Sequence, residues 1–264
     1  STYNNISHQE PVEQFTSLIE QLNQLPLAYV HIMKIPFPAD QFPQYPIDAV
    51  ETFGKISTHP VIANCGYTRE TGEAEMQAII QNFVESAHRA KKIGIDGIEL
   101  HAAHGYLLHQ FLSPIANQRQ DQYGGSLENR IRFMLELFSA VRKEWGGVLG
   151  VRLSASDWLE HGWGLPDSVE LTLRLKQLGC DYIHVSSGGI SPKQQIKLGP
   201  NYQVPFAKEI KQKTGMTTMA VGLITEPEQA EEILQNQEAD LIALARAFLY
   251  KPRWGWEAAA ALGG

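Results

Sequence analysis

Two imidazoles and a phenol lie close together in the segment 101–106, which reads His-Ala-Ala-His-Gly-Tyr. A neutral imidazole offers one N–H donor, and a phenol can also pass on a proton. His101, His104 and Tyr106 therefore suit the binding of an anion or a carbonyl oxygen, with Tyr106 supplying a proton. The H-x-x-H spacing also occurs in metal sites. No Asp, Glu or Cys stands directly beside the two histidines, however, although Glu99 is close in sequence, so we predict no metal site. Packing of both histidines against loop carbonyls is the remaining alternative.

A charged side chain, Arg152, interrupts the apolar run 150–154. A guanidinium inside a buried strand needs a partner, because leaving it unpaired away from water is costly. An ion pair with Glu99 or Asp157 would satisfy it. Alternatively, Arg152 supplies a fixed positive charge to an electron-rich ring or an anion.

Small residues and one arginine follow the later strand-like runs. In parallel barrels, the loops after the last two strands commonly bind phosphate through backbone N–H groups. Here these loops carry Gly222 and the pair Ala245-Arg246, and Ser187-Gly188 follows the preceding strand. We predict a phosphate site from these five residues. The chain has no GxGxxG or GxxxxGK[ST] motif, so a Rossmann or P-loop site is not supported.

Apolar runs alternate with helix-period segments along the whole chain, which predicts a parallel sheet with right-handed crossovers. A long loop should lead from 102 through 117–119 to 123–126, and a proline-rich loop should span 36–46. The predicted helices are 11–25, 47–56, 75–93, 126–145, 166–179, 205–213, one from 225 and an Ala-rich C-terminal helix. The predicted strands are 28–32, 61–64, 97–101, 150–154, 181–185, 217–221 and 240–244.

These elements predict an α/β fold, a parallel (βα)8 TIM-type barrel formed by one domain, residues 1–264. About seven strands are evident, whereas a closed barrel of this kind has about eight. The missing strand would come from an irregular segment, near the N-terminus or at 37–45, or from exchange with a second chain. A homodimer is therefore one way to close the barrel.

Composition narrows the class of protein. The chain has 264 residues, 43% hydrophobic and 19% charged, which is enough for a sizeable core. A net charge of -7 argues against a nucleic-acid surface. Cys65 and Cys180 have no CxxC spacing, so neither a disulfide framework nor a structural metal is expected. No apolar run reaches about 18 residues and residues 1–5 do not resemble a signal peptide, so we expect a cytoplasmic protein without a membrane segment.

The segment 101–130 resembles the old yellow enzyme family. It carries HAAHGY at 101–106, LLHQFLSP at 107–114 and DQYGGSLENR at 121–130. The similarity covers residues 76–264 almost continuously and is greatest to the shorter bacterial branch. Further matching segments are 151–157, 186–189, 220–222 and 243–246.

The resemblance implies an ene-reductase on an eight-stranded βα barrel. In this family NAD(P)H reduces non-covalent FMN, and the hydride then goes to the β-carbon of an activated alkene such as an enone. The resemblance implies that His101 and His104 hold the substrate carbonyl or a phenolic ligand, and that Tyr106 donates the proton. It places Arg152 against the flavin's pyrimidine edge. It assigns the FMN phosphate to Gly222, Ala245 and Arg246.

Residues 1–75 resemble the same family out of order. The segments 25–32 and 63–70 look like the sixth and seventh strands of the longer-chain branch, where the first three strands should stand. An internal repeat agrees, since 12–32 parallels 169–185, although all barrel units look broadly alike. The pattern suggests a chimeric or rearranged barrel built from two relatives.

Two other functions are therefore open. One is a chimeric or engineered scaffold that binds flavin or phosphate with little or no turnover. The other is a phosphate-binding barrel enzyme of the aldolase type, but no predicted strand offers the lysine that a Schiff base would need.

Overall fold

The computed structural model describes residues 11–24, 30–33, 52–53, 55–58, 61–64 and 69–263. The chain forms two compact units, Ser1–Asn82 and Phe83–Gly264, and each is described by itself. The single domain expected from the sequence stays a prediction.

The first unit contains a helix and a pair of strands. Helix α1 spans Pro11–Leu22, and strands β1 (Val30–Met33) and β2 (Val61–Asn64) pair in parallel, with Val30 opposite Val61. The rings of Phe15 and Phe53 lie 5.8 Å apart and contribute to its packing. The predicted loop 36–46 lies outside the described residues, as does most of the predicted helix 47–56.

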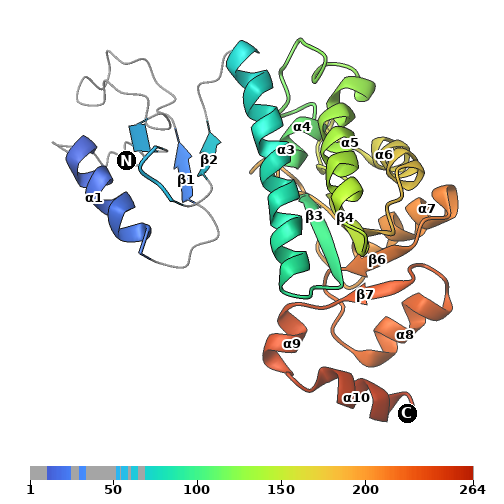
Figure 1. Ribbon diagram of the computed structural model, residues 1–264. Coiled ribbons are helices and arrows are strands. Elements are labelled where there is room, and N and C mark those ends of the chain that lie inside the picture. Colours follow the sequence, from blue (N-terminus) through green and yellow to red (C-terminus); the bar gives the residue numbers. More distant parts are fainter. Residues whose placement is uncertain are drawn as a thin grey trace. The chain divides into compact units, whose positions relative to one another are not determined.

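The second unit is built on a five-stranded parallel sheet whose strands follow chain order (Figure 1). All seven predicted strands are present among the described residues, and the parallel α/β class is confirmed. They form an open five-stranded sheet and a separate two-stranded one rather than a closed barrel. The five strands are β3 (Gly97–Ala102), β4 (Val148–Ser154), β5 (Tyr182–Ser186), β6 (Thr218–Val221) and β7 (Leu241–Ala243).

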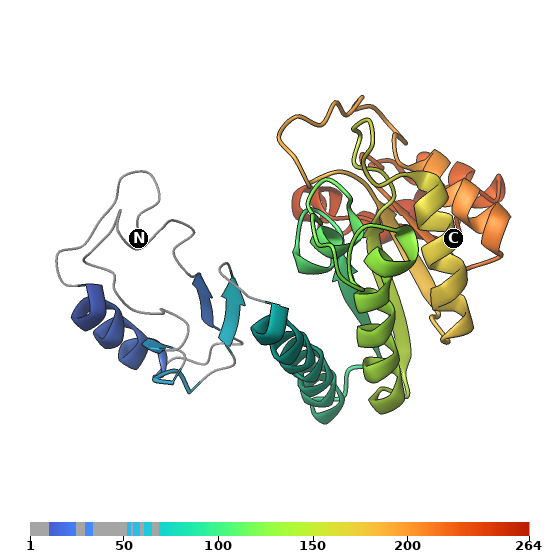
Figure 2. The ribbon, with the colours of Figure 1, turned by 90° about the horizontal axis from the view of Figure 1, so that it is seen from above.

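Helices connect the strands and cover one face of this sheet (Figure 2). Helix α3 (Arg69–Lys92) precedes β3 and runs six residues further toward the N-terminus than the predicted helix. The predicted N-cap at Ser126 is confirmed, since its side chain accepts a hydrogen bond from the Asn129 N–H. The other helices are α4 (Leu107–Leu112), α5 (Leu127–Glu144), α6 (Leu165–Gln177), α7 (Val204–Thr214), α8 (Pro227–Gln235), α9 (Arg246–Tyr250) and α10 (Trp254–Ala261).

Helix α4 corrects one prediction, because a continuous loop was expected after residue 101. Leu108 and Leu112 stand four residues apart, on one helical face, and both are buried. The helix follows directly on Tyr106, which occupies its N-cap position. This short helix therefore fixes the point at which the 101–106 segment leaves the sheet.

The two faces of the sheet differ in their surroundings. Side chains alternate along a strand, so Leu100 and Ala102 of β3 are buried while His101 between them is only half-buried. Val151 and Leu153 flank Arg152 in the same way on β4. The helices cover the apolar face, and the candidate functional side chains stand on the other.

Two findings bear on the predicted class of protein. No helix among the described residues is long and apolar enough to span a membrane. Cys180 is a buried free thiol, and burial raises its pKa to about 12. Cys65 lies outside the described residues.

Candidate active site

The three side chains of the 101–106 segment come together at the carboxyl end of β3. His101 is still within the strand, His104 lies in the turn that follows, and Tyr106 begins α4. The His101 ring lies 5.3 Å from the His104 ring and 5.1 Å from the Tyr106 ring, centroid to centroid. Tyr106 is 62% exposed, so its hydroxyl can meet a ligand from solvent. The structure therefore places the two imidazoles and the phenol side by side.

Arg152 joins this cluster through the register of the sheet. Arg152 is the parallel partner of His101 on β3 and of His184 on β5, so the three side chains form a row across one face. The Arg152 Nε atom is buried and has no hydrogen-bond partner within the described part of the chain. Neither Glu99 nor Asp157 forms an ion pair with Arg152 among the described residues, which leaves its charge available to a ligand.

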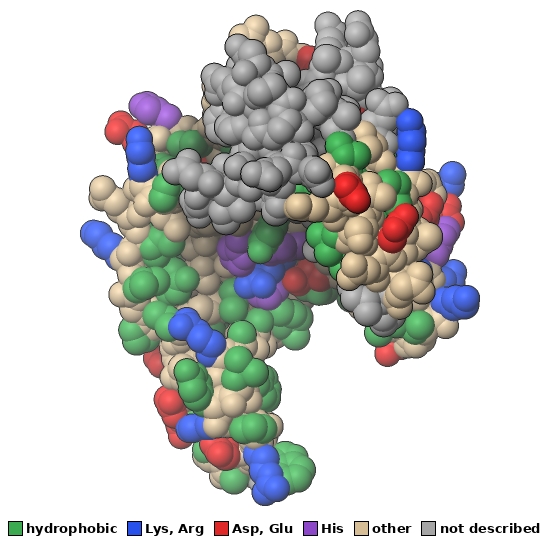
Figure 3. Space-filling model, turned by 90° about the vertical axis from the view of Figure 1, so that its left-hand side faces the viewer, with side chains coloured by type: hydrophobic (Ala, Val, Ile, Leu, Met, Phe, Trp, Pro, Cys, Tyr) green, Lys and Arg blue, Asp and Glu red, His purple; other side chains and the backbone are tan. Residues whose placement is uncertain are grey.

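Glu99 has a different partner. His184 Nδ1 lies 3.0 Å from Glu99 Oε2, and the Tyr182 hydroxyl also donates to this carboxylate. Burial alone would raise the pKa of Glu99, but the hydrogen bond from His184 and nearby positive charge outweigh it, so the pKa is lowered. In Figure 3, histidine side chains lie beside basic and acidic side chains near the middle of the face shown.

Serines at the ends of β4 and β5 hold His104. Its backbone has a φ of 58°, a left-handed conformation that non-glycine residues seldom adopt. The His104 N–H donates to Ser154 Oγ at 3.0 Å, and its Nε2 lies 2.6 Å from Ser186 Oγ. Burial, with the positive charge of Arg152, lowers the pKa of His104 to about 4. The ring is therefore neutral near pH 7.

Burial and Arg152 also lower the pKa of His101. Neither ring nitrogen of His101 has a hydrogen-bond partner in the part of the chain that the structure describes. Both histidines can thus present a neutral N–H to a ligand.

A buried aspartate supports the turn from the opposite side. His109 is fully buried, accepts a hydrogen bond from the Gly105 N–H at 2.9 Å and donates through Nε2 to Asp157 at 2.9 Å. Asp157 also accepts from Ser113 Oγ and from the Trp163 N–H. This network orients the turn between His104 and Tyr106.

The predicted phosphate residues lie after β5, β6 and β7. Gly222 has a φ of 113°, and a Cβ there would meet the side chains of Gln203 and Tyr202. Arg246 is exposed beside Tyr202, where it partly offsets the burial that raises the pKa of that phenol. Ala245 is the N-cap residue of α9. Gly222 and Arg246 are therefore both near Tyr202.

Ser187 and Gly188 are engaged within the protein. The Ser187 hydroxyl donates to Gln203 Oε1 at 2.7 Å, and the Gly188 N–H donates to the Ser156 carbonyl at 2.8 Å. Their predicted role as direct phosphate ligands stays a prediction, but both groups already have partners. The two residues belong to the segment that follows β5, and Gln203 connects this segment to the end of β6.

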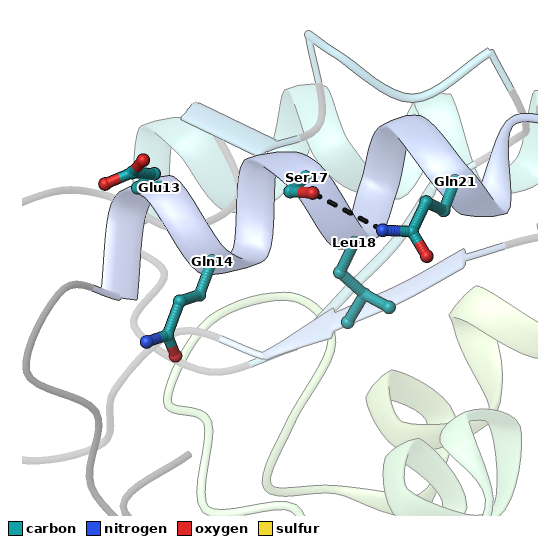
Figure 4. Close-up of a pocket in the computed structure, with 5 residues that line it drawn as sticks. All are labelled: Glu13, Gln14, Ser17, Leu18 and Gln21. Carbon is teal, nitrogen blue, oxygen red and sulfur yellow. Dashed lines mark hydrogen bonds between the residues drawn. The ribbon is translucent and has the colours of Figure 1, made fainter.

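A cavity of about 450 Å3 lies along α1 in the first unit (Figure 4). Five residues of that one helix line it, and Gln21 Nε2 donates to Ser17 Oγ at 3.4 Å among them. None of the predicted catalytic or phosphate residues contributes to this cavity. We therefore assign it no part in the site.

Sequence reasoning missed the residues that hold the histidines in place. Ser154, Ser186, Gln203 and the His109–Asp157 pair all make their contacts across long stretches of chain. The sequence offered one indication of their role: several of these residues lie at the end of a predicted strand, next to residues predicted to form the site.

Comparisons with known proteins place the chain in a family. Residues 3–262 match the model of the NADH:flavin oxidoreductase / NADH oxidase family. The chain is 50% identical to an NADPH dehydrogenase from Geobacillus sp. (strain WCH70) over 195 residues, which are 74% of this chain and 57% of that protein. It is 41% identical to the NADPH dehydrogenase of Bacillus subtilis (strain 168) over 249 residues, covering 92% of this chain and 70% of that one.

Solved structures agree with the fold class. A 2-naphthoyl-CoA reductase bound to 2-naphthoyl-CoA has a TM-score of 0.67 and 27% identity, covering 71% of this chain and 29% of that chain. Morphinone reductase in complex with tetrahydroNAD has a TM-score of 0.61 and 28% identity, covering 77% of this chain and 53% of its own. The chain thus spans a little over half the length of the first curated relatives it matches.

Proposed function

We propose that this chain, which belongs to the NADH:flavin oxidoreductase / NADH oxidase family, the family of the old yellow enzyme, reduces activated alkenes such as α,β-unsaturated carbonyl compounds. Family membership implies FMN as the cofactor and NAD(P)H as the electron donor. The observation that carries the proposal is the cluster of two neutral imidazoles, an exposed phenol and a guanidinium with a buried Nε at the carboxyl end of the sheet.

The residues present fit FMN. The buried Arg152 Nε has no hydrogen-bond partner among the described residues, and a guanidinium pairs well with electron-rich ring atoms or an anion. Arg152 would hold the flavin's pyrimidine edge. Gly222, Ala245 and Arg246 would hold the phosphate, and Ser187 and Gly188 would lie beside it. Bound FMN supplies hydride chemistry, taking two electrons from NAD(P)H and making them available to an acceptor.

His101 and His104 would bind the carbonyl oxygen of the alkene substrate. Two neutral N–H donors stabilise the negative charge that develops on that oxygen as the alkene is reduced. The same pair would bind a phenolic ligand. Tyr106 would supply the proton that the substrate carbon needs, and its exposed hydroxyl beside His101 suits that role.

The absorption spectrum of the purified protein tests the cofactor. We expect a yellow protein with flavin bands, or one that becomes yellow on reconstitution with FMN. A colourless protein that FMN does not reconstitute would contradict the proposal. That result would favour the second candidate, a rearranged scaffold with little or no turnover, to which the open five-stranded sheet lends support.

Tyr106→Phe tests the proton donor. We expect the variant to slow alkene reduction about a hundredfold or more, because positioned general acids contribute about that much. Flavin reduction by NADPH should proceed at nearly the wild-type rate, since that step needs no proton from Tyr106. Stopped-flow absorbance follows the two half-reactions separately, and an equal loss in both would remove Tyr106 from the role.

A further inference from the structure

A buried amide side chain links the two halves of the candidate site. Gln203 lies just before α7 and is 2% exposed. Its Nε2 donates to the Val221 carbonyl at 2.7 Å, next to Gly222. Its Oε1 accepts from Ser187 Oγ at 2.7 Å and lies 3.3 Å from Ser186 Oγ. A carbonyl can only accept, so the Val221 contact fixes which end of the amide faces the serines.

Ser186 connects this amide to His104. The Ser186 hydroxyl has one proton and two acceptors within reach, His104 Nε2 at 2.6 Å and Gln203 Oε1 at 3.3 Å. The shorter contact has the length of a strong hydrogen bond, whereas the longer one is near the limit. Gln203 Oε1 already accepts from Ser187 at 2.7 Å. The difference between the two contact lengths favours placing the Ser186 proton on the bond to His104.

A neutral imidazole carries its proton on one nitrogen, and the partner of the other nitrogen decides which. His104 Nδ1 has no hydrogen-bond partner within the described residues, so it is the nitrogen left to face a ligand. If Nε2 carried the proton, Nδ1 would present a lone pair to a carbonyl oxygen and repel it.

We propose that Ser186 is a positioning residue that donates its hydroxyl proton to His104 Nε2, and so keeps the His104 proton on Nδ1. Gln203 connects Ser187, the neighbour of Ser186, to the end of β6. The ligand-binding consequence rests on the proposed function, because the Nδ1–H then becomes one of the two donors to the substrate oxygen. The proton assignment itself concerns the protein alone.

Nitrogen-15 NMR of the full chain, labelled in its histidines, tests the assignment because protonated and unprotonated ring nitrogens have distinct shifts. We expect wild-type His104 to show a protonated Nδ1 and an unprotonated Nε2 at pH 7. Ser186→Ala should move His104 toward the opposite tautomer. Ser186→Thr, which keeps a hydroxyl, should restore the wild-type pattern.

Ser139→Ala is the control. It removes a serine hydroxyl that donates to the Leu135 carbonyl at 2.8 Å, outside the candidate site, so the His104 shifts should stay as in the wild type. In FMN-loaded protein, Ser186→Ala should weaken the binding of phenol by roughly three- to tenfold, the value of one hydrogen bond.

A wild-type spectrum with a protonated Nε2 would overturn the proposal, and this result needs no variant to fold. Unchanged His104 shifts in folded Ser186→Ala would overturn it as well. These spectra require no flavin. A protein that fails to bind FMN but shows the expected tautomer would therefore refute the proposed function and leave the role of Ser186 standing.

Discussion

Positive charge shapes the candidate site at the level of single residues. Arg152 lies between His101 and His184 in the register of the sheet, so three basic side chains share one row. Protonating His101 or His104 would add a charge next to a guanidinium that has no ion-pair partner among the residues that the structure describes. Burial is the largest cause of the lowered pKa of each histidine, and the charge of Arg152 is the next largest. The site thus keeps its imidazoles as neutral donors near pH 7.

The lowered pKa of His104 makes stability depend on pH. Its pKa is about 4 in the folded protein and 6.5 ordinarily, so the unfolded chain binds this proton first as the pH falls. The His104 contribution to the free energy of unfolding is therefore lost progressively between about pH 6.5 and pH 4. Urea unfolding at several pH values measures it.

His104→Asn supplies the comparison, because asparagine does not titrate. The free energy of unfolding of the wild type should fall relative to the variant as the pH drops through that window. The difference between them should be constant above about pH 7. If the unfolding free energies of the two proteins stayed parallel over the whole pH range, the pKa of His104 would not be lowered in the folded protein.

At the scale of elements, hydrophobic pattern predicted the strands well but missed α4. Seven apolar runs marked the seven observed strands, since a buried strand needs little more than local apolar character. Leu108 and Leu112 carried the helical signal of α4, yet six residues are too few for a pattern to stand out. The hydrogen-bond partners of His104 could not be predicted. Ser186, for example, is 82 positions away in sequence and contacts His104 only because the strands pair.

The buried His109–Asp157 pair should be important for stability. Both side chains are fully buried and Nε2 lies 2.9 Å from the carboxylate. His109→Leu would leave a buried charge with fewer partners and the Gly105 N–H without an acceptor. We expect a loss of roughly 3–5 kcal/mol in the free energy of unfolding, measured by urea denaturation.

His88 provides the matched control for this measurement. It also contacts a carboxylate, that of Glu144 at 3.3 Å, but the two side chains are 51% and 43% exposed. His88→Leu should therefore cost less than about 1 kcal/mol. Similar losses in the two variants would show that the His109 network does not hold the turn.

The turn after β3 and the turn after β5 pack backbone against backbone. Gly105 and Gly125 both have a φ of 78°, but a Cβ on Gly105 would strike the Gly189 carbonyl, whereas nothing lies within 4 Å of a Cβ on Gly125. Gly105→Ala should destabilise by roughly 2–5 kcal/mol, because backbone strain and overpacking add. Gly125→Ala should show only the strain, about 1–2 kcal/mol. Equal effects in thermal unfolding would contradict a close approach of the two turns.

At the scale of the whole molecule, the described strands do not close. A complete parallel barrel has no free edges, but this five-stranded sheet ends at β3 and β7. The resemblance of residues 1–75 to late barrel units would account for the family's earlier strands not being evident in the sequence. This interpretation stays a prediction. The family model nevertheless matches residues 3–262, so both compact units carry family sequence.

Unpaired edge strands favour association with another chain, because their N–H and C=O groups remain free to pair. We therefore expect the protein to form a homodimer of twice 29.5 kDa in sedimentation velocity experiments. Leu241 on the edge strand β7 is 42% exposed, and Leu241→Lys should shift the protein toward the monomer. Leu249 is 80% exposed but lies on helix α9 rather than on an edge strand, so Leu249→Lys should leave the dimer intact. A wild type that stays monomeric at every concentration, or an equal effect of both lysines, would show that the sheet edges do not pair between chains.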